Sequence, residues 1–221
     1  DHGGAMRSMK RAAGGAAEMN EIRRQHSAED RQIVQDLKAG RSAEALEKMQ
    51  HRGYLREHKD PAAVREAIAQ NVVSDLREGK TSIGLAASRA DVAGINTAAR
   101  TLAREQGLLQ GEDRTFKTQA SPEAAEKTKN FAVGDRVITL KNDKSLQLKN
   151  GQTFTVTNAA EGRLTLRQDE TGREVKISEK QYKAIDHAYG ATVHKSQGVT
   201  IDHAHGMLGD AQPDRLGRRE G

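Results

Sequence analysis

Between residues 131 and 177 the chain alternates short apolar stretches with pairs of turn-forming residues, and no other feature of the sequence restricts the fold as much. The turn pairs are Gly134-Asp135, Asn150-Gly151, Glu161-Gly162 and Thr171-Gly172. Glycine and asparagine in such pairs supply the backbone conformations that tight hairpin turns need. Strands this short and this closely spaced are typical of small barrels. We therefore expect residues 131–183 to form a small β barrel of the SH3 type.

The sequence before residue 110 has a helical period instead. Apolar side chains at Val64, Ile68 and Val72 predict a helix that begins at Asp60-Pro61 and ends at Gly79. A short buried strand is expected at 82–87, followed by a helix at 91–106. Further helices are expected at 28–39 and 42–53, and strands at 184–193 and 201–207.

These patterns predict an α/β unit that the barrel interrupts. The α/β unit would comprise residues 19–109 and 184–209. Residues 110–130 are polar and poor in large apolar side chains, so they would form a linker or an exposed hairpin. Residues 1–18, rich in Gly and Ala, would be a flexible lead-in, and residues 210–221 a tail.

Composition narrows the class of partner. Lys and Arg number 36 against 31 Asp and Glu, a net charge of +5 that fits a polyanionic partner or, equally, a mildly basic solvated surface. Cysteine is absent, which excludes disulfides and thiolate metal sites and fits a reducing cytoplasm. No apolar run approaches the ~20 residues that a membrane span needs. We therefore expect a cytoplasmic protein without membrane insertion.

The densest group of polar side chains lies at 189–198, where a predicted strand runs into a turn that ends in glycine. Such a turn can offer several hydrogen-bond donors to a phosphodiester chain. Thr192, Ser196 and the Gly198 amide are candidate phosphate donors, Lys195 can supply charge, and His194 would order the turn. Gln197 completes the candidate set. The alternative is a polar loop that merely ends a strand.

This segment resembles motif V of superfamily 1 DNA helicases, in the version found in RecD and in conjugative relaxases of the TraI, TrwC and TraA kind. Three other segments resemble the same family in the same order. Residues 17–25 are similar to helicase motif IV, and residues 88–100 to the strand-to-helix step of the second RecA-like domain. Residues 131–151 look like the opening of the SH3-like 2B subdomain.

The resemblance implies a fold and a set of contacts. The fold would be a partial RecA-like domain, made of helices and a short, mainly parallel sheet, with a small SH3-like barrel inserted. Arg24 would reach the nucleotide γ-phosphate, although it could equally be a surface residue paired with Glu21. Single-stranded DNA would pass along the barrel, where solvated hairpin tips are the alternative reading. The candidate barrel contacts are Lys141, Asn142, Lys144, Lys149 and Asn150.

The same resemblance implies what is absent. A P-loop and a Walker B carboxylate would lie upstream of residue 1, and residues 210–219 do not fit motif VI. Phosphoryl transfer needs Mg²⁺ and a phosphate cradle as well as an arginine. We therefore expect ATP and Mg²⁺ to be cofactors of the full-length protein only, with none for this fragment, which should not hydrolyse ATP alone.

Two functions follow as hypotheses. The chain could be the DNA-binding part of a relaxase helicase, working with upstream motor and relaxase domains of the same protein. Alternatively, it could be a vestigial helicase domain that binds single-stranded DNA and is recruited to type IV secretion, with a type IV coupling protein as a candidate partner. A scaffold without activity of its own is the third reading.

Two segments imitate other sites. Gly79-Lys80-Thr81-Ser82 resembles the tail of a P-loop, but the first glycine of that motif would fall at Ser74, inside a predicted helix, so Gly79 is better read as a helix stop. His203 and His205 lie on one face of a predicted strand and could suggest a metal clip or a nuclease histidine pair. We interpret them as a polar strand edge and predict no metal site.

Overall fold

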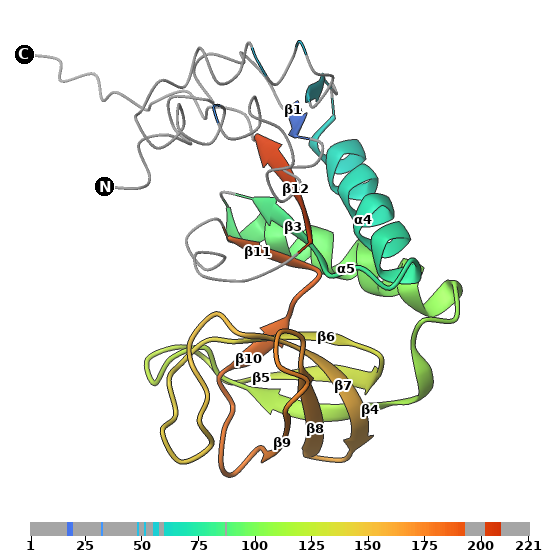
Figure 1. Cartoon of the computed structure of the whole chain (residues 1–221). Helices are drawn as coiled ribbons and strands as arrows, with labels where there is room; N and C mark the ends of the chain where they lie inside the picture. The colour runs from blue at the N-terminus through green and yellow to red at the C-terminus, as the bar shows by residue number, and fades with distance from the viewer. Residues whose placement is uncertain are drawn as a thin grey trace, which may run out of the picture.

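The computed structural model describes residues 17–19, 55–57, 60–86, 88–192 and 202–208, together with the single positions 32, 48 and 51. They form a mixed α/β fold in two parts, an α/β unit drawn in the upper half of Figure 1 and a β unit below it. The predicted mixed α/β fold class with a partly parallel sheet is confirmed. The predicted helices at 28–39 and 42–53 lie outside the described residues except for single positions.

The α/β unit contains a five-stranded sheet in the order β11-β3-β12-β1-β2. The central strand β3 runs parallel to both β11 and β12, whereas β1 is antiparallel to β12 and to β2. The predicted strands at 82–87 and 201–207 are therefore confirmed as neighbours in one sheet. The strands are β1 (Ala17–Met19), β2 (Leu55–Glu57), β3 (Ser82–Ala86), β11 (Gly190–Thr192) and β12 (His203–Leu208).

Two helices pack on this sheet, and local sequence explains their ends. Helix α4 (Pro61–Arg77) begins where the Asp60 side chain accepts a hydrogen bond from the Ala62 amide, at 3.0 Å. Gly79 follows with φ at +77°, so its reading as a helix stop is confirmed. Helix α5 (Arg89–Glu105) is capped by Ser88. The predicted helices at 61–79 and 91–106 are thus correct to within a few residues.

The core of the α/β unit joins both helices to β3. Ile68 of α4 and Ile95 of α5 are fully buried. A Cβ at Gly84 would lie 2.7 Å from Ile68 Cγ2 and 2.9 Å from Ile95 Cγ2, so the absence of a side chain there lets the helices approach the strand. Tyr189 completes this cluster from the segment that enters β11.

The β unit contains an antiparallel five-stranded sheet, in the order β10-β6-β7-β8-β9, and a separate β4–β5 hairpin. Both share one apolar core around Phe116, Phe131 and Phe154. Gly151, Gly162 and the other turn glycines have positive φ, as tight turns require. The strands are β4 (Gln110–Thr118), β5 (Lys127–Val133), β6 (Arg136–Thr139), β7 (Thr153–Ala160), β8 (Arg163–Gln168), β9 (Glu174–Ser178) and β10 (Ile185–His187).

The pairing of β4 with β5 places a hairpin in the range 110–130. Sequence reasoning left a linker and an exposed hairpin open for this range. The long polar strand β4 was not foreseen because most of its side chains are exposed and only Phe116 and Thr118 are buried. The hairpin packs through Phe116 against Phe131, with the ring centroids 6.1 Å apart in an edge-on arrangement.

A buried carboxylate joins the two units. Asp135 is fully buried and accepts hydrogen bonds from the Ala132 amide, the Tyr189 hydroxyl and Arg100 of α5, at 2.7 to 3.1 Å. Arg100 also pairs with Asp113 of β4 at 2.6 Å. Because one carboxylate accepts hydrogen bonds from α5, from β5 and from the segment before β11, it fixes the β unit against the α/β unit.

No helix in the described part of the chain is long and apolar enough to cross a bilayer.

Candidate nucleic-acid interface

The first candidate surface is the edge of the parallel sheet where β11 ends. Thr192 is half-buried and is paired in register with Ala86 at the end of β3. Asn96 of α5 holds the start of this strand, since its Oδ1 accepts from the Gly190 amide at 2.8 Å and its Nδ2 donates to the Gly190 carbonyl at 3.3 Å. Ligands of open α/β sheets bind outside the carboxyl ends of the parallel strands. The chain therefore leaves β11 at an edge suited to ligand contact.

The remainder of the predicted turn lies outside the described residues. This part comprises the candidate DNA contacts His194, Lys195, Ser196, Gln197 and Gly198. Arg24, predicted to sense nucleotide, lies outside them as well. Their roles stay predictions.

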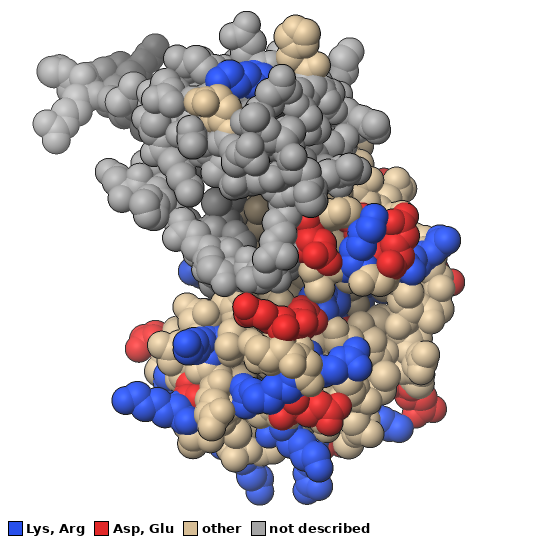
Figure 2. Space-filling view, in the orientation of Figure 1, with Lys and Arg blue, Asp and Glu red and all other residues tan. Residues whose placement is uncertain are grey.

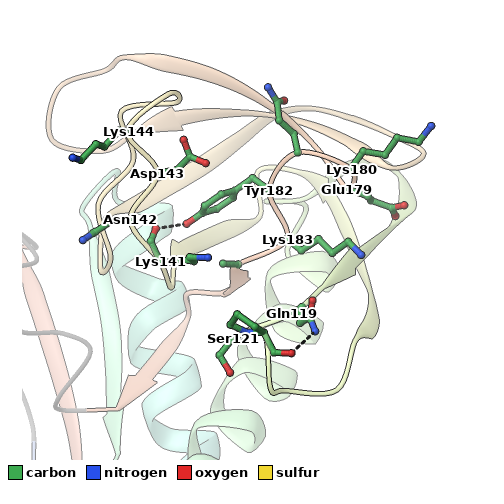
Figure 3. Close-up of a pocket in the computed structure, with 13 residues that line it drawn as sticks. Gln119, Ser121, Lys141, Asn142, Asp143, Lys144, Glu179, Lys180, Tyr182 and Lys183 are labelled. Atoms are coloured by element: carbon green, nitrogen blue, oxygen red, sulfur yellow. Dashed lines mark hydrogen bonds between the residues drawn. The ribbon is translucent and has the colours of Figure 1, made fainter.

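The second candidate surface is a groove of about 500 Å³ in the β unit (Figure 3). Three segments line it: residues 119–122 after β4, residues 141–144 after β6, and residues 179–184 between β9 and β10. Figure 3 shows Lys141, Asn142 and Lys144 on one loop, opposite Gln119 and Ser121. Segments far apart in sequence thus meet around one polar hollow.

Hydrogen bonds make the 141–150 loop rigid. Tyr182 donates its hydroxyl proton to the Lys141 carbonyl at 2.6 Å, across the groove floor. The Asn150 amide donates to Asn142 Oδ1 at 2.8 Å, and Asp143 exchanges two backbone hydrogen bonds with Leu148, each 2.8 Å long. A loop held in this way loses little conformational entropy when it binds a ligand.

The groove edge carries more positive than negative charge. Lys141, Lys144 and Lys180 are exposed and form no salt bridge with any other described residue. Lys183 is different, because it pairs with Glu126. In Figure 2 the basic side chains of the β unit are interspersed with acidic ones rather than gathered into one patch. Unpaired ammonium groups on a rigid edge can neutralise backbone phosphates, and this is the chemistry that the groove offers.

The acidic groups near the groove are already occupied by hydrogen bonds. Hydrogen bonds from Ser145 and the Leu146 amide hold the pKa of Asp143 below its usual value. Glu179 accepts from the Lys117 amide at 2.7 Å. Asp143 therefore remains ionised at neutral pH and lowers the local charge without closing the groove.

The structure places some of the predicted DNA contacts of residues 131–183 at the groove and others away from it. Lys141, Asn142 and Lys144 line the groove, whereas Lys149 and Asn150 are exposed outside the lining and brace the loop through backbone amides. Thr192 does not belong to the lining either. Sequence reasoning missed the opposite wall, Lys180 to Lys183. The polar run between two predicted strands was its only signal, because Tyr182 reads as core.

Comparison with known proteins places this geometry in a family context. A family model described as an AAA domain matches residues 1–60. The conjugal transfer protein TraA of Rhizobium radiobacter is 33% identical over 190 residues, and the TraA protein of Agrobacterium fabrum is 31% identical over 190 residues. Each match covers 85% of this chain and 17% of the relative, so the chain spans only a small part of the length of these relatives.

Helicases named Pif1 match this chain over shorter stretches than the TraA proteins do. The ATP-dependent DNA helicase Pif1 of Bdellovibrio bacteriovorus is 32% identical over 114 residues, 44% of this chain and 25% of that protein. Among solved structures, unliganded Pif1 from Bacteroides sp matches with a TM-score of 0.41 and 26% identity, over 57% of this chain and 46% of that one.

These matches fit a superfamily 1, RecD-like helicase region, which is the class that the sequence motifs indicated. Within that class, the curated relatives that align with most of this chain are conjugal transfer proteins named TraA.

Proposed function

We propose that this chain is the DNA-binding part of a conjugative relaxase helicase. In this proposal the α/β unit is a portion of the second RecA-like motor domain and residues 131–183 form the SH3-like 2B barrel. The lead-in expected at residues 1–18 overlaps β1, so Ala17 and Glu18 belong to the sheet instead, and residues 210–221 would be a tail. Similarity to TraA over 85% of the chain supports this reading, as does the presence of parallel strands that lead into the motif V segment.

The lysines at the edge of the groove are the observation that most supports DNA binding. Lys141 and Lys144 lie on a loop that internal hydrogen bonds hold in place, and Lys180 lies on the opposite wall. None of the three forms a salt bridge with another described residue. Single-stranded DNA would lie along this edge, with Thr192, Lys195 and Ser196 holding a further stretch of its backbone.

The nucleotide would bind to a domain outside this chain. ATP and Mg²⁺ would bind a neighbouring motor domain, and Arg24 would reach the γ-phosphate from this chain. In a protein that contains both motor domains, Arg24→Ala should lower ATP hydrolysis by ~10³-fold or more while single-stranded DNA binding persists. The vestigial alternative, a DNA-binding module recruited to type IV secretion, predicts no ATP hydrolysis to lose.

The direct test is fluorescence anisotropy with a labelled single strand. The groove variant combines Lys141→Ala, Lys144→Ala and Lys180→Ala. Its matched control removes three exposed cations of the same unit that lie outside the groove, in the substitutions Lys127→Ala, Arg167→Ala and Lys176→Ala. Both variants lose the same net charge, so only a local effect separates them. Weaker binding in the groove variant alone supports the proposal, and equal losses contradict it.

The motif V segment is tested separately. Thr192→Ala combined with Lys195→Ala should weaken binding of the same strand, because it removes one hydroxyl donor and one cation from the proposed backbone contact. If affinity is unchanged, the polar-loop reading of residues 192–198 is correct instead.

A further inference from the structure

A cluster outside the proposed DNA interface gathers three metal-ligating side chains. His203 and His205 project from the same face of β12, because alternate residues of a strand share a face. Asp75, near the end of α4, lies over that face. His203 Nδ1 is 2.9 Å from Asp75 Oδ1, and His205 Nε2 is 2.7 Å from Asp75 Oδ2. The three candidate ligand atoms all lie within 4.8 Å of one another.

The surrounding structure holds these side chains in place. Ser82 donates its hydroxyl proton to Asp75 Oδ2 at 2.8 Å. His203 and His205 sit opposite Ser82 and Gly84 in the parallel ladder with β3. Few degrees of freedom remain, which favours a preorganised ligand set.

Burial and charge also suit a cation. The side chains of Asp75 and His203 are 14% exposed and that of His205 is 7% exposed, so the cluster is largely shielded from solvent. Burial alone would raise the pKa of Asp75, yet the hydrogen bonds with His205, His203 and Ser82 outweigh it, and the pKa lies below its ordinary value. The carboxylate is therefore negative at neutral pH.

We propose that Asp75, His203 and His205 form a binding site for a transition-metal cation of the Zn²⁺ class. Two imidazole nitrogens and one carboxylate oxygen are a ligand set that Zn²⁺ takes in proteins, with water in the fourth position. Metal–ligand distances of about 2.0–2.2 Å at tetrahedral angles separate neighbouring ligand atoms by about 3.3–3.6 Å. The observed separations, 2.9 Å to Asp75 Oδ1 and 2.7 Å to Asp75 Oδ2, would therefore have to open by about 0.4–0.9 Å. Because a metal-bound imidazole nitrogen carries no proton, binding would release protons.

The ring nitrogen of His205 that faces away from Asp75 determines how tightly the site is expected to bind a metal. This nitrogen, Nδ1, is buried and has no hydrogen-bond partner among the residues that the structure describes. Metal-bound histidines usually donate from that nitrogen, and loss of such a partner lowers metal affinity by about 10–100-fold. We therefore expect a reversible site that a chelator empties readily.

The metal site would link two structural elements, α4 and β12, and would not be part of the DNA interface. It lies where β12 begins and α4 ends, whereas Thr192 lies at the end of β11, and these strands are both parallel to β3. The two regions therefore lie toward opposite ends of the parallel strands. Cation binding would tie α4 to β12 and stabilise the α/β unit, and it does not depend on the proposed function being correct.

Thermal unfolding of the tag-free chain with Zn²⁺ is the first test. At a hundredfold excess over the dissociation constant, Tm should rise by about 5–10 °C, and EDTA should reverse the rise. Calorimetry should give one Zn²⁺ per chain. Asp75→Asn and His203→Gln should abolish both effects, whereas His51→Gln, which changes an exposed histidine, should keep them.

A second measurement keeps the test decisive if a substitution unfolds the chain. Co²⁺ added to the unsubstituted chain should give the intense visible absorption of a four- or five-coordinate ion with nitrogen ligands, in a ratio of one per chain. The proposal is overturned if Co²⁺ keeps the weak spectrum of its octahedral aquo ion. It is overturned equally if Zn²⁺ binding persists in folded Asp75→Asn and His203→Gln chains, since other histidines would then be the ligands.

Discussion

Tyr189→Phe tests how strongly the buried carboxylate joins the two units. The substitution removes only a hydroxyl, which donates to Asp135 Oδ1 at 2.7 Å, and both side chains are fully buried. Burial, together with the neighbouring Asp135 charge, raises the pKa of Tyr189, so the phenol is the proton donor at every pH of interest. Asp135 keeps its contacts with Arg100 and the Ala132 amide. The change therefore isolates one hydrogen bond to a buried charge.

Such a bond contributes about 1.5–3 kcal/mol to stability. For a chain of this size that predicts a fall in Tm of roughly 3–12 °C. Urea unfolding at neutral pH, followed by circular dichroism, measures the difference. The control is Tyr182→Phe, which removes a hydroxyl that donates at 2.6 Å to an uncharged acceptor, the Lys141 carbonyl, and should cost only about 0.5–1.5 kcal/mol. If Tyr189→Phe costs no more than Tyr182→Phe, Asp135 is not the charged centre of the junction.

Three further predictions follow from particular residues. Hydrogen bonds and charge from Arg136 outweigh burial and hold the pKa of Asp169 below its ordinary value of 3.8, so this pair stabilises the fold fully above about pH 5 and progressively less as pH falls below about 4. Unfolding free energy measured against pH should show this loss, and Asp169→Asn should flatten the profile. Gly134→Ala should destabilise the chain by at least about 1–3 kcal/mol, because φ is +96° and the new Cβ would lie 2.3 Å from the Leu108 carbonyl oxygen. In the same urea titration Gly172→Ala, with φ at +72° and open space, should show only the backbone cost of about 1–2 kcal/mol.

Local patterns in the sequence were sufficient for the regular elements. The spacing of Val64, Ile68 and Val72 predicts α4, and glycine turn pairs predict the breaks between β6, β7, β8 and β9. These signals work because helix period and turn conformation depend on neighbouring residues.

Contacts between distant residues were beyond such patterns. Gly134-Asp135 reads as an ordinary exposed turn, yet Asp135 is fully buried because Arg100 and Tyr189 meet there from distant parts of the chain. The same limit hid the contact of Asp75 with His203 and His205, since the histidines alone read as a polar strand edge. At the groove, one loop was predicted, but its opposite wall at 180–183 was not.

The salt dependence of single-stranded DNA binding tests the central claim most directly. Each phosphate that a cation neutralises adds about 0.7 to the slope of log Kobs against log salt concentration. If Lys141, Lys144 and Lys180 each contact one phosphate, their combined replacement by alanine should reduce the slope by about 2. Between 50 and 200 mM salt, the variant should then lose about 20-fold less affinity than the unsubstituted chain. An unchanged slope would contradict the account, because the groove would then not hold the DNA backbone.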